Sequence, residues 1–241
     1  MSLYDDLDLE KGVHRMIAAP TGGGKSYFVG AMIEGLYEKK IPFIIFDTKT
    51  ENHIGLIALK DVKKLTISPK YNYKNLDALL DYPYILCVPA SRNIDIADII
   101  NIYREILSFL WLNEKGKRIF ICEEAHNWNK NASVPDPLFE RIAREGRGAE
   151  KYLWFVTQRL QNFSQLLWAQ CGITYLMHFN IPSDIRYASQ MIPEFDWKKS
   201  DGKKIPGLNY ELAEHDVLIW DGREYKIIKA ADVKRKTEHK G

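Results

Sequence analysis

The segment Ala-Pro-Thr-Gly-Gly-Gly-Lys-Ser, residues 19–26, constrains the fold of this chain more than any other. It follows an apolar stretch at 13–18, typical of a short strand, and precedes a helical pattern that begins at Tyr27. Consecutive glycines let backbone N–H groups turn inward around an anion, and the N-terminus of a following helix adds partial positive charge. The order of strand, glycine loop and helix therefore predicts a phosphate-binding loop in an α/β fold. The alternative is a glycine-rich turn without chemical consequence.

The polar residues of this loop have distinct expected tasks. Lys25 is expected to reach the β- and γ-phosphates of a nucleoside triphosphate, and the Ser26 hydroxyl to complete the coordination of Mg²⁺. The usual pattern opens with glycine, whereas this chain has Ala19. The expected nucleotide-binding residues are Thr21, Gly22, Gly23, Gly24, Lys25, Ser26 and Tyr27.

Strand-like and helix-like segments alternate along most of the chain, which is typical of a parallel sheet with helices on both faces. Asn93 is the expected N-cap of a long helix that ends at Leu112. We expect one P-loop domain over residues 1–241, with its core at about 13–228. The other expected strands are 41–47, 65–67, 84–89, 118–122, 152–157 and 172–179, and the other helices are 137–147, 163–170 and 183–191.

The C-terminal region departs from this alternation. Residues 217–228 predict a β-hairpin, with Asp221 and Gly222 suited to a type I′ turn. A polar loop is expected at 198–204. The basic tail occupies residues 229–241, and we expect its end, from Lys234 onward, to be frayed.

Composition bounds the class of protein. Hydrophobic residues make up 46% of the 241 residues, which is ample for a packed core. The formal net charge of +2 means that any nucleic-acid contact must be local. Three cysteines without CxxC or Cys/His spacing indicate buried, reduced thiols and argue against a structural metal site. The chain has no basic signal region and no apolar run of about 20 residues, so we expect a soluble protein that is not secreted.

A second motif follows the expected strand 118–122, where the acidic residues Glu123 and Glu124 come directly after apolar ones. The first acid of such a pair belongs near Mg²⁺, and the second can polarise the water that attacks the γ-phosphate. The more frequent pattern has Asp first, and Glu123 is one methylene longer. We therefore expect Glu123 at the metal, Glu124 as a catalytic residue, and hydrolysis rather than transfer to a small molecule. A solvated acidic strand end is the alternative.

Two further segments carry candidate catalytic residues. Gln158 follows the strand 152–157, where it can sense the γ-phosphate or hold the attacking water; an ordinary strand-to-helix turn is the alternative. The segment 141–148 places three arginines near a helix end, and arginine can bridge phosphate oxygens from a neighbouring subunit. Arg147 is the first candidate for such a finger acting in trans, and Arg144 is the second. Surface salt bridges are the alternative for each.

Taken in order, these motifs resemble the HerA/FtsK superfamily of DNA-pumping ATPases, with Glu-Glu-Ala-His-Asn at 123–127 most similar to the HerA branch. The segment Asp-Thr-Lys-Thr-Glu at 47–51 is similar to that group's Asp-x-Lys-x-Glu motif. The resemblance covers about residues 13–228. It implies a three-layer, RecA-like P-loop fold with an additional strand, ATP and Mg²⁺ as cofactors, and a homo-oligomeric ring, expected to be a hexamer, around double-stranded DNA.

The chain also differs from larger members of that superfamily. It has no room for their N-terminal β-barrel or membrane segments, and it is similar in size to the genome-packaging ATPases of membrane-containing icosahedral viruses. That similarity implies capsid or portal components as partners, and a location in the host cell or the virion. A HerA-like motor in DNA processing or defence, and a nucleotide-gated interaction switch, remain as alternatives.

A motor that threads DNA should offer short basic loops, because phosphate contacts suit movement that is independent of sequence. Trp128 could stack on a base, but we expect it more simply to be a partly buried interface residue. His126 is expected to orient its neighbours rather than to bind a metal. Each lysine loop is otherwise a solvated surface loop. The candidate DNA-binding residues are Lys130, Lys198, Lys199, Lys203 and Lys204.

Overall fold

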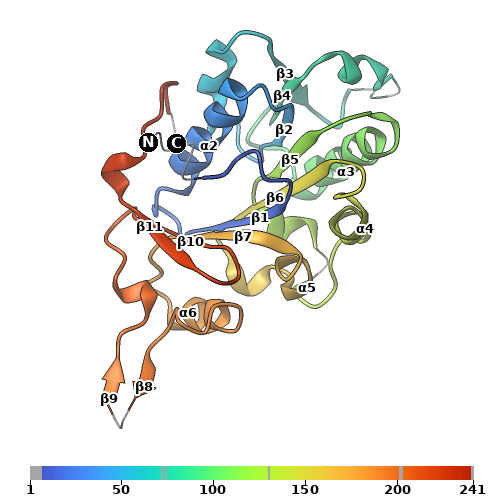
Figure 1. Ribbon diagram of the computed structural model, residues 1–241. Coiled ribbons are helices and arrows are strands. Elements are labelled where there is room, and N and C mark those ends of the chain that lie inside the picture. The colour runs from blue at the N-terminus through green and yellow to red at the C-terminus, as the bar shows by residue number, and fades with distance from the viewer. Residues whose placement is uncertain (1–6, 72, 74, 130, 201–202, 240–241) are drawn as a thin grey trace.

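The computed structural model describes residues 7–71, 73, 75–129, 131–200 and 203–239, and its main element is a nine-stranded sheet (Figure 1). The strand order is β11-β10-β7-β1-β6-β5-β2-β4-β3. Strands β1 to β7 of this sheet are parallel, and β10 runs antiparallel to both of its neighbours. The predicted α/β class with a mainly parallel sheet and a C-terminal hairpin is confirmed.

The elements alternate along the chain as the apolar pattern predicts. The strands are β1 (His14–Ala18), β2 (Phe43–Phe46), β3 (Val62–Ile67), β4 (Tyr84–Pro89), β5 (Arg118–Cys122), β6 (Lys151–Thr157), β7 (Cys171–Leu176), β8 (Lys198–Ser200), β9 (Lys203–Ile205), β10 (Val217–Trp220) and β11 (Tyr225–Ile228). The α-helices are α2 (Lys25–Glu38), α3 (Ile96–Asn113), α4 (Pro137–Glu145), α5 (Gln165–Trp168) and α6 (Pro182–Ser189). Short 3₁₀ turns are η1 (Ile54–Ala58), η2 (Asp77–Asp81), η3 (Ala125–Trp128), η4 (Leu160–Asn162), η5 (Leu208–Tyr210) and η6 (Ala230–Asp232).

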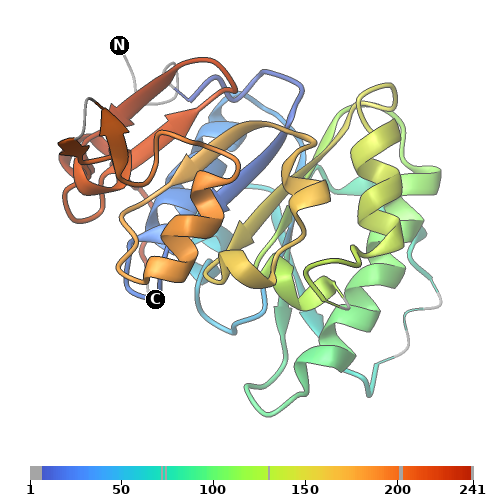
Figure 2. The same ribbon diagram turned by 90° about the horizontal axis from the view of Figure 1, so that it is seen from below.

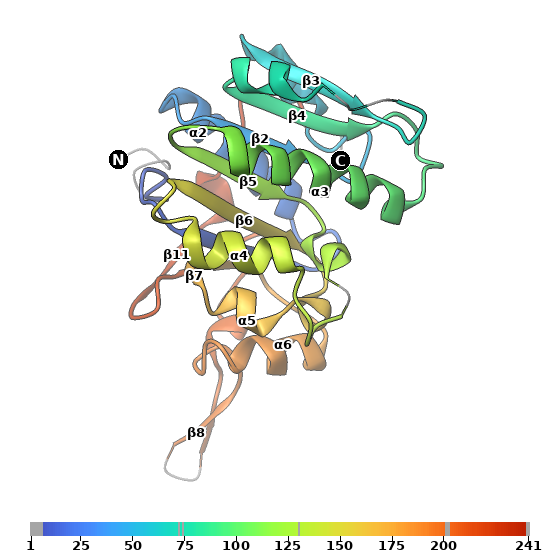
Figure 3. The same ribbon diagram turned by 90° about the vertical axis from the view of Figure 1, so that its right-hand side faces the viewer.

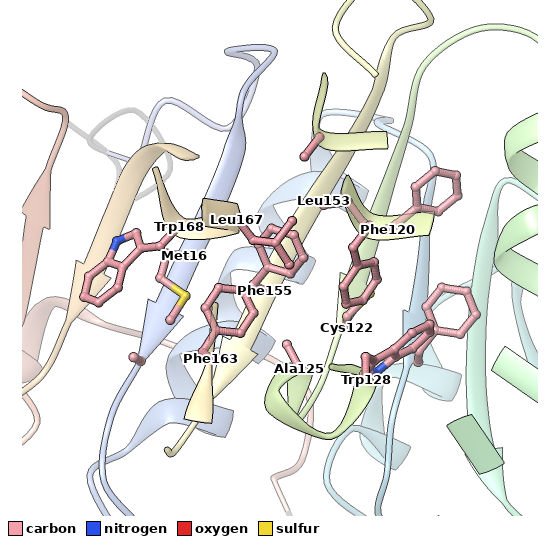
Figure 4. Packing of buried hydrophobic residues seen from close by; sticks show 14 of the residues in the cluster. Met16, Phe120, Cys122, Ala125, Trp128, Leu153, Phe155, Phe163, Leu167 and Trp168 are labelled. Carbon is pink, nitrogen blue, oxygen red and sulfur yellow. The ribbon is translucent and has the colours of Figure 1, made fainter. Parts of the chain in front are cut away.

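The sheet is buried on both faces, because helices cover each of them. Successive residues of β1 point to opposite faces, so Met16 packs in one core layer and Ile17 in the other. Helices α3, α4, α5 and α6 cover the first layer, as Figures 2 and 3 show, whereas α2 covers the second. Figure 4 shows Met16, Phe155 and Trp168 of the first layer, which come from β1, β6 and α5. The predicted three-layer architecture is thus confirmed.

Parallel strands bring the candidate motifs to one edge of the sheet. The glycine loop follows the end of β1, the acidic pair follows β5, and Gln158 follows β6. These three strands are neighbours in the order β1-β6-β5, so their carboxyl ends lie side by side. In open α/β sheets, ligands bind outside the carboxyl ends of the strands.

Four local predictions were wrong. The N-cap of α3 is Asp95, which accepts a hydrogen bond from Ala97 N, and not Asn93. The helix predicted at 163–170 is only one turn long, since α5 spans Gln165–Trp168. It begins after its N-cap Ser164, which follows the 3₁₀ turn η4. The turn of the C-terminal hairpin is not type I′, because Gly222 has a positive φ but neither Asp221 nor Arg223 does, and Asp221 N donates to Glu224 O. The polar segment 198–204 is not simply a loop, since β8 and β9 form an antiparallel hairpin that projects from the body (Figures 1 and 3).

The C-terminal tail also differs from the prediction of a frayed end. Val233 is buried, and the residues that follow it hydrogen-bond to Glu34 in the middle of α2. The sequence pattern of the tail is dominated by charges, so it gives no sign of this docking. All three cysteines are free thiols; Cys87 and Cys122 are buried as predicted, whereas Cys171 is half-buried. No helix among the described residues has the length and apolar character to cross a membrane.

Candidate functional site

The glycine loop takes a conformation that only glycine adopts without strain at two positions. Gly22 and Gly24 have φ of 80° and 86°, in the left-handed region. The loop closes through a hydrogen bond from Gly23 N to Pro20 O at 3.0 Å, and Phe28 N then donates to Gly24 O as α2 begins. Ala19, which replaces the usual glycine, is fully buried in the core beside α2 and is not among the residues with positive φ. An alanine therefore fits at this position.

Lys25 at the start of α2 lies against the acidic pair. Its Nζ is 3.2 Å from Glu123 Oε2 and 3.9 Å from Glu124 Oε1, and all three side chains are at most 7% exposed. Burial disfavours the charge on Lys25, but the two carboxylates outweigh burial and raise the pKa of Lys25. Burial and the nearby Glu123 charge raise the pKa of Glu124. The loop and the acidic pair thus form one charged cluster.

Glu123 is held from its other side by a histidine that the motifs do not include. His53 Nε2 lies 2.8 Å from Glu123 Oε1, and both side chains are fully buried. Burial would raise the pKa of Glu123, but Lys25 and the His53 hydrogen bond lower it, so the carboxylate stays ionised. Asp47, at the end of β2, is also fully buried, and burial together with Glu123 raises the pKa of Asp47 to about 6. Its Oδ1 accepts a hydrogen bond from Lys49 N at 3.0 Å.

The acidic pair and the end of β6 are connected through His126. His126 Nδ1 lies 2.8 Å from Thr157 Oγ1 and 3.5 Å from Glu124 Oε2, in accord with its expected orienting role. Burial and the positive charges of Arg159 and Lys25 lower the pKa of His126 to about 4, so its ring is neutral at pH 7. Beside it, Gln158 Oε1 accepts a hydrogen bond from Thr21 Oγ1 at 2.8 Å. The expected proximity of Gln158 to the loop is therefore confirmed.

A cavity of about 270 Å³ lies against the glycine loop and Gln158. The cavity is lined by the glycine loop with Lys25, Ser26 and Tyr27, and by Gln158, which follows β6. The remaining lining residues come from segments outside the expected site, namely Lys49, Asn52 and His239. A triphosphate would thus meet two lysines and the N-terminus of α2, a set of positive charges that suits an anion.

The donor set at this edge fits Mg²⁺. The described residues contain no cluster of three or more His, Cys, Asp or Glu side chains that would hold a metal by itself. Mg²⁺ usually binds one or two carboxylates together with substrate phosphates and water, and oxygen donors suit it. Ser26 offers a hydroxyl that lines the phosphate cavity, and Glu123 offers a carboxylate in contact with Lys25, which lines the same cavity. They are the residues that would hold the ion.

Both candidate arginines lie far from this site. Arg144 pairs with Glu140 one turn earlier on α4, and its side chain is 69% exposed. Arg147 is exposed in the turn that leads into β6. Gln158 follows the other end of that seven-residue strand, so about 23 Å separates the two positions. Neither arginine can reach the phosphates bound to its own chain.

Of the lysines proposed for DNA contact, the structure describes only some. Lys203 is exposed on the projecting hairpin, and Lys198, Lys199 and Lys204 belong to its strands, although their side chains are outside the described set. Lys130 also lies outside the described residues. Trp128 is fully buried and packs between Phe139 and Phe46, so neither base stacking nor a partly buried interface position is correct for it.

Several residues of the site, among them Lys49, His53 and His239, escaped prediction from sequence. Lys49 lies within the segment 47–51 that resembles a motif, so a signal for it was present. His53 lies in a loop seven residues after the last apolar residue of β2, and His239 lies at the end of the charged tail. Neither position carries a periodic or motif signal, because each joins the site through contacts far apart in sequence.

The fold and the site define a P-loop nucleoside triphosphatase, and comparison with known proteins gives its family. The family described as "Helicase HerA, central domain" matches residues 6–162, and the chain belongs to it. It is thus a P-loop ATP hydrolase of the HerA/FtsK type. No curated protein matches the sequence at a significant level.

Solved structures show the same fold at low sequence identity. The genome packaging NTPase B204 from Sulfolobus turreted icosahedral virus 2, in complex with ATP-gammaS, has a TM-score of 0.64 and 19% identity, covering 90% of this chain and 97% of that one. The DNA-packaging ATPase B204 from Sulfolobus turreted icosahedral virus has a TM-score of 0.65 and 19% identity, and the match covers 90% of this chain and 97% of that one. VirB4 of Thermoanaerobacter pseudethanolicus has a TM-score of 0.64 and 10% identity, and the match covers 90% of this chain and 88% of that one.

Proposed function

We propose that this chain is a Mg²⁺-dependent ATPase that assembles into a ring and translocates double-stranded DNA, in viral genome packaging. The observation that carries the ATPase part is that Lys25 and Gln158 line one cavity together with the glycine loop, while Lys25 also contacts both members of the acidic pair. Support for the packaging role comes from the two viral NTPases, whose lengths the alignment covers almost fully. The HerA family match also supports the alternative of a motor in DNA processing or defence.

The proposed chemistry begins with Lys25 exchanging its partners. Its ammonium group contacts two carboxylates, and a triphosphate in the cavity would draw it toward the phosphate oxygens. Glu123 would then be available, with Ser26, to hold Mg²⁺, which neutralises charge on the β- and γ-phosphates when bound. Loss of contact with Lys25 would also leave Glu124 more basic, because an opposite charge lowers the pKa of an acid.

Glu124 is the residue proposed to take a proton from the attacking water. Burial and its neighbour Glu123 raise its pKa, which favours a general base. Its backbone has a φ of 47°, an uncommon left-handed conformation for a residue with a side chain, and such positions cluster at functional sites. His126 orients Glu124 and connects it to Thr157, and Gln158 on the same strand end is proposed to hold the water or to sense the γ-phosphate.

The arginines are proposed to act between subunits. Arg147 lies at the amino edge of the sheet, about 23 Å from the carboxyl edge that carries the nucleotide cavity. An Arg147 that stabilises transition-state charge must therefore serve a neighbour's nucleotide, with Arg144 as second candidate. An interface that joins one edge of a subunit to the opposite edge of the next is heterologous, and such interfaces form a ring when the rotation between successive subunits closes.

The proposal is tested by measuring ATP hydrolysis with and without double-stranded DNA. We expect DNA to stimulate hydrolysis, and Lys25→Ala and Glu124→Gln to abolish it. Lys115→Ala and Glu105→Gln make the same chemical changes at exposed positions away from the site and should leave the rate unchanged. Hydrolysis by a monomer that DNA does not affect would contradict the motor and favour a nucleotide-gated switch.

The trans arrangement has its own test. Mixtures of Arg147→Ala and Lys25→Ala subunits should recover part of the activity that each variant lacks, because some interfaces then contain both intact halves. The control is a chain that carries both substitutions, mixed with the Lys25→Ala variant. No subunit in that mixture has Lys25, so no interface is intact. No recovery under conditions that allow subunit exchange would exclude Arg147 as the finger in trans.

DNA contact is proposed for the projecting β8–β9 hairpin. It carries Lys198, Lys199, Lys203 and Lys204 over eight residues, and it extends away from the sheet (Figure 1). Lysine contacts to phosphates give affinity that falls steeply with salt. Replacing these four lysines with serine should reduce DNA stimulation and its salt dependence, while hydrolysis without DNA persists. An unchanged salt dependence would assign the DNA contact elsewhere, for example to Lys130.

A further inference from the structure

The C-terminal tail is anchored on α2 through one buried carboxylate. Glu34 is 2% exposed and accepts hydrogen bonds from Lys236 N at 2.7 Å, Thr237 N at 2.8 Å and Thr237 Oγ1 at 2.6 Å. The guanidinium of Arg235 lies 3.6 Å from the same carboxylate, with its side chain fully buried. A buried charge is stable only when it is paired and hydrogen-bonded. Glu34 and the tail therefore supply each other's partners.

Two glycines provide the surface on which the tail lies. A Cβ added to Gly30 of α2 would be 2.5 Å from the Arg235 guanidinium carbon, and one added to Gly55 of η1 would be 2.0 Å from Glu238 O. Glycine inside a helix costs about 1 kcal/mol relative to alanine. Here Gly30 makes room for the arginine, so helix and tail fit each other closely.

The anchored tail brings its residues beside the phosphate loop. Arg235 N donates to the Tyr27 hydroxyl at 3.2 Å, and the His239 ring meets the edge of Tyr27 with 5.7 Å between ring centroids. Tyr27 lies between two cavities that share it and Gly24. One is the polar phosphate cavity. The other has a volume of about 410 Å³ and is lined by Gly24, Tyr27, Phe28, His215, Ala230 and Val233.

The two cavities differ in chemistry as the two ends of a nucleotide do. The first offers lysines, a serine and a helix N-terminus, which suit phosphates. The second offers mainly aromatic and aliphatic side chains, and its volume lies within the range of about 300–1,000 Å³ typical of small-molecule sites. We propose that the segment from His215 to the tail forms the base-binding half of the nucleotide site, with the purine ring enclosed by Tyr27, Ala230 and Val233.

This inference rests on the proposed nucleotide function and adds the part of the chain that reads the base. His215 supplies the polar side chain of this lining. A largely apolar pocket discriminates weakly between ligands of similar shape, so we expect ATP and GTP to bind within about tenfold of each other. The base would thus add affinity through burial and stacking, and Ala230 and Val233, which line the apolar cavity, would be needed for full nucleotide affinity.

The test compares ATP with tripolyphosphate, a ligand that has the phosphates but no base. Ala230→Phe should fill the apolar cavity and weaken ATP binding by about tenfold, a difference of about 1.4 kcal/mol, while the affinity for tripolyphosphate changes less than about twofold. Ala149→Phe makes the same substitution at an exposed turn of the other sheet edge and should affect neither ligand. Calorimetry measures both affinities, and circular dichroism confirms that each variant is folded.

The outcomes separate this inference from the proposed function. If Ala230→Phe leaves ATP binding unchanged, or weakens both ligands equally, the base is not bound in this cavity. If instead His239→Ala weakens ATP selectively, the base lies on the other side of Tyr27 and the assignment is overturned. A preference for ATP over GTP far above tenfold would also overturn the apolar reading. If Lys25→Ala changes neither ligand, the nucleotide function itself fails.

Discussion

His14, at the start of β1, makes the stability of the protein depend on pH in a way that can be calculated. Its ring is 5% exposed, and Nδ1 accepts a hydrogen bond from Leu153 N at 2.9 Å. Burial, with a smaller contribution from the charge of Arg147, lowers the pKa of His14 to about 4. In the unfolded chain a histidine titrates near pH 6.5. Between these two values the unfolded state therefore binds more protons than the folded state.

The sign and the size follow from this difference. Stability is complete above pH 6.5 and decreases as the pH falls toward 4, because the unfolded chain gains a proton that folded His14 excludes. A shift of about 2.5 pH units corresponds to about 3.4 kcal/mol in total, of which about 2 kcal/mol is lost by pH 5. Acid also protonates Nδ1, so the bond from Leu153 N would be lost in any folded form that carries the charge.

The assay is urea unfolding at pH 7 and at pH 5, in the wild type and in His14→Asn. Asparagine places an oxygen near the position of Nδ1 and does not titrate, so it keeps an acceptor for Leu153 N. The loss of unfolding free energy between pH 7 and pH 5 should be smaller in the variant by about 2 kcal/mol. Other groups, including His126, titrate equally in both proteins. An equal loss in both would refute the assignment of this pH dependence to His14.

Three further changes test the interior and the site. Trp128→Ala should lower the free energy of unfolding by about 3–5 kcal/mol because it empties a fully buried position. Trp128→Phe should remain folded and keep any response to DNA. A mild effect of the alanine substitution would contradict the packing of Trp128 in the core. Lys25→Met should destabilise the protein by about 3 kcal/mol, since it leaves two buried carboxylates without the Lys25 cation. Adding Glu123→Gln in the same chain should restore part of this stability. If the effects of the two substitutions on the free energy of unfolding simply add, in thermal or urea unfolding, the coupling is contradicted. Asp47 is ionised at pH 7 although burial raises its pKa to about 6. Asp47→Asn should therefore raise the free energy of unfolding by about 3 kcal/mol at pH 7 and by little at pH 4, and a loss of stability at pH 7 would contradict this assignment.

Much of the fold could be predicted because its signals are local. Apolar runs such as 118–122 and 152–157 are long enough to indicate buried strands, and their alternation with helices requires parallel pairing. Where local signals were weak, the boundaries moved. The strand predicted at 65–67 extends from Val62, because pairing with β4 extends an edge strand whose lysines face solvent. The docking of the tail could not be predicted, since it depends on Glu34, some 200 residues earlier in the chain.

The same distinction applies to the site. Its loop, acidic pair and Gln158 could be placed together because they follow strands that neighbour one another in such sheets. His53 could not, because an isolated histidine in a loop carries no pattern, and its position against Glu123 depends on the path of the chain after β2. Trp128 was misplaced for a related reason. Its neighbours 127 and 129 are polar, but the 3₁₀ turn η3 points its ring inward, where it packs against Phe139.

The charges of the site explain why nucleotide and metal should bind together. Lys25 is the cation that both members of the acidic pair contact, and all three side chains are almost inaccessible to water. If Lys25 moves to a phosphate, Glu123 retains His53 on one oxygen but has no partner on the other. A buried carboxylate without a counter-charge is costly, so Glu123 then needs another cation at Oε2. Nucleotide binding without a metal would therefore be opposed by the acidic pair itself, and the affinity for ATP should rise with Mg²⁺ more in the wild type than in Glu123→Gln.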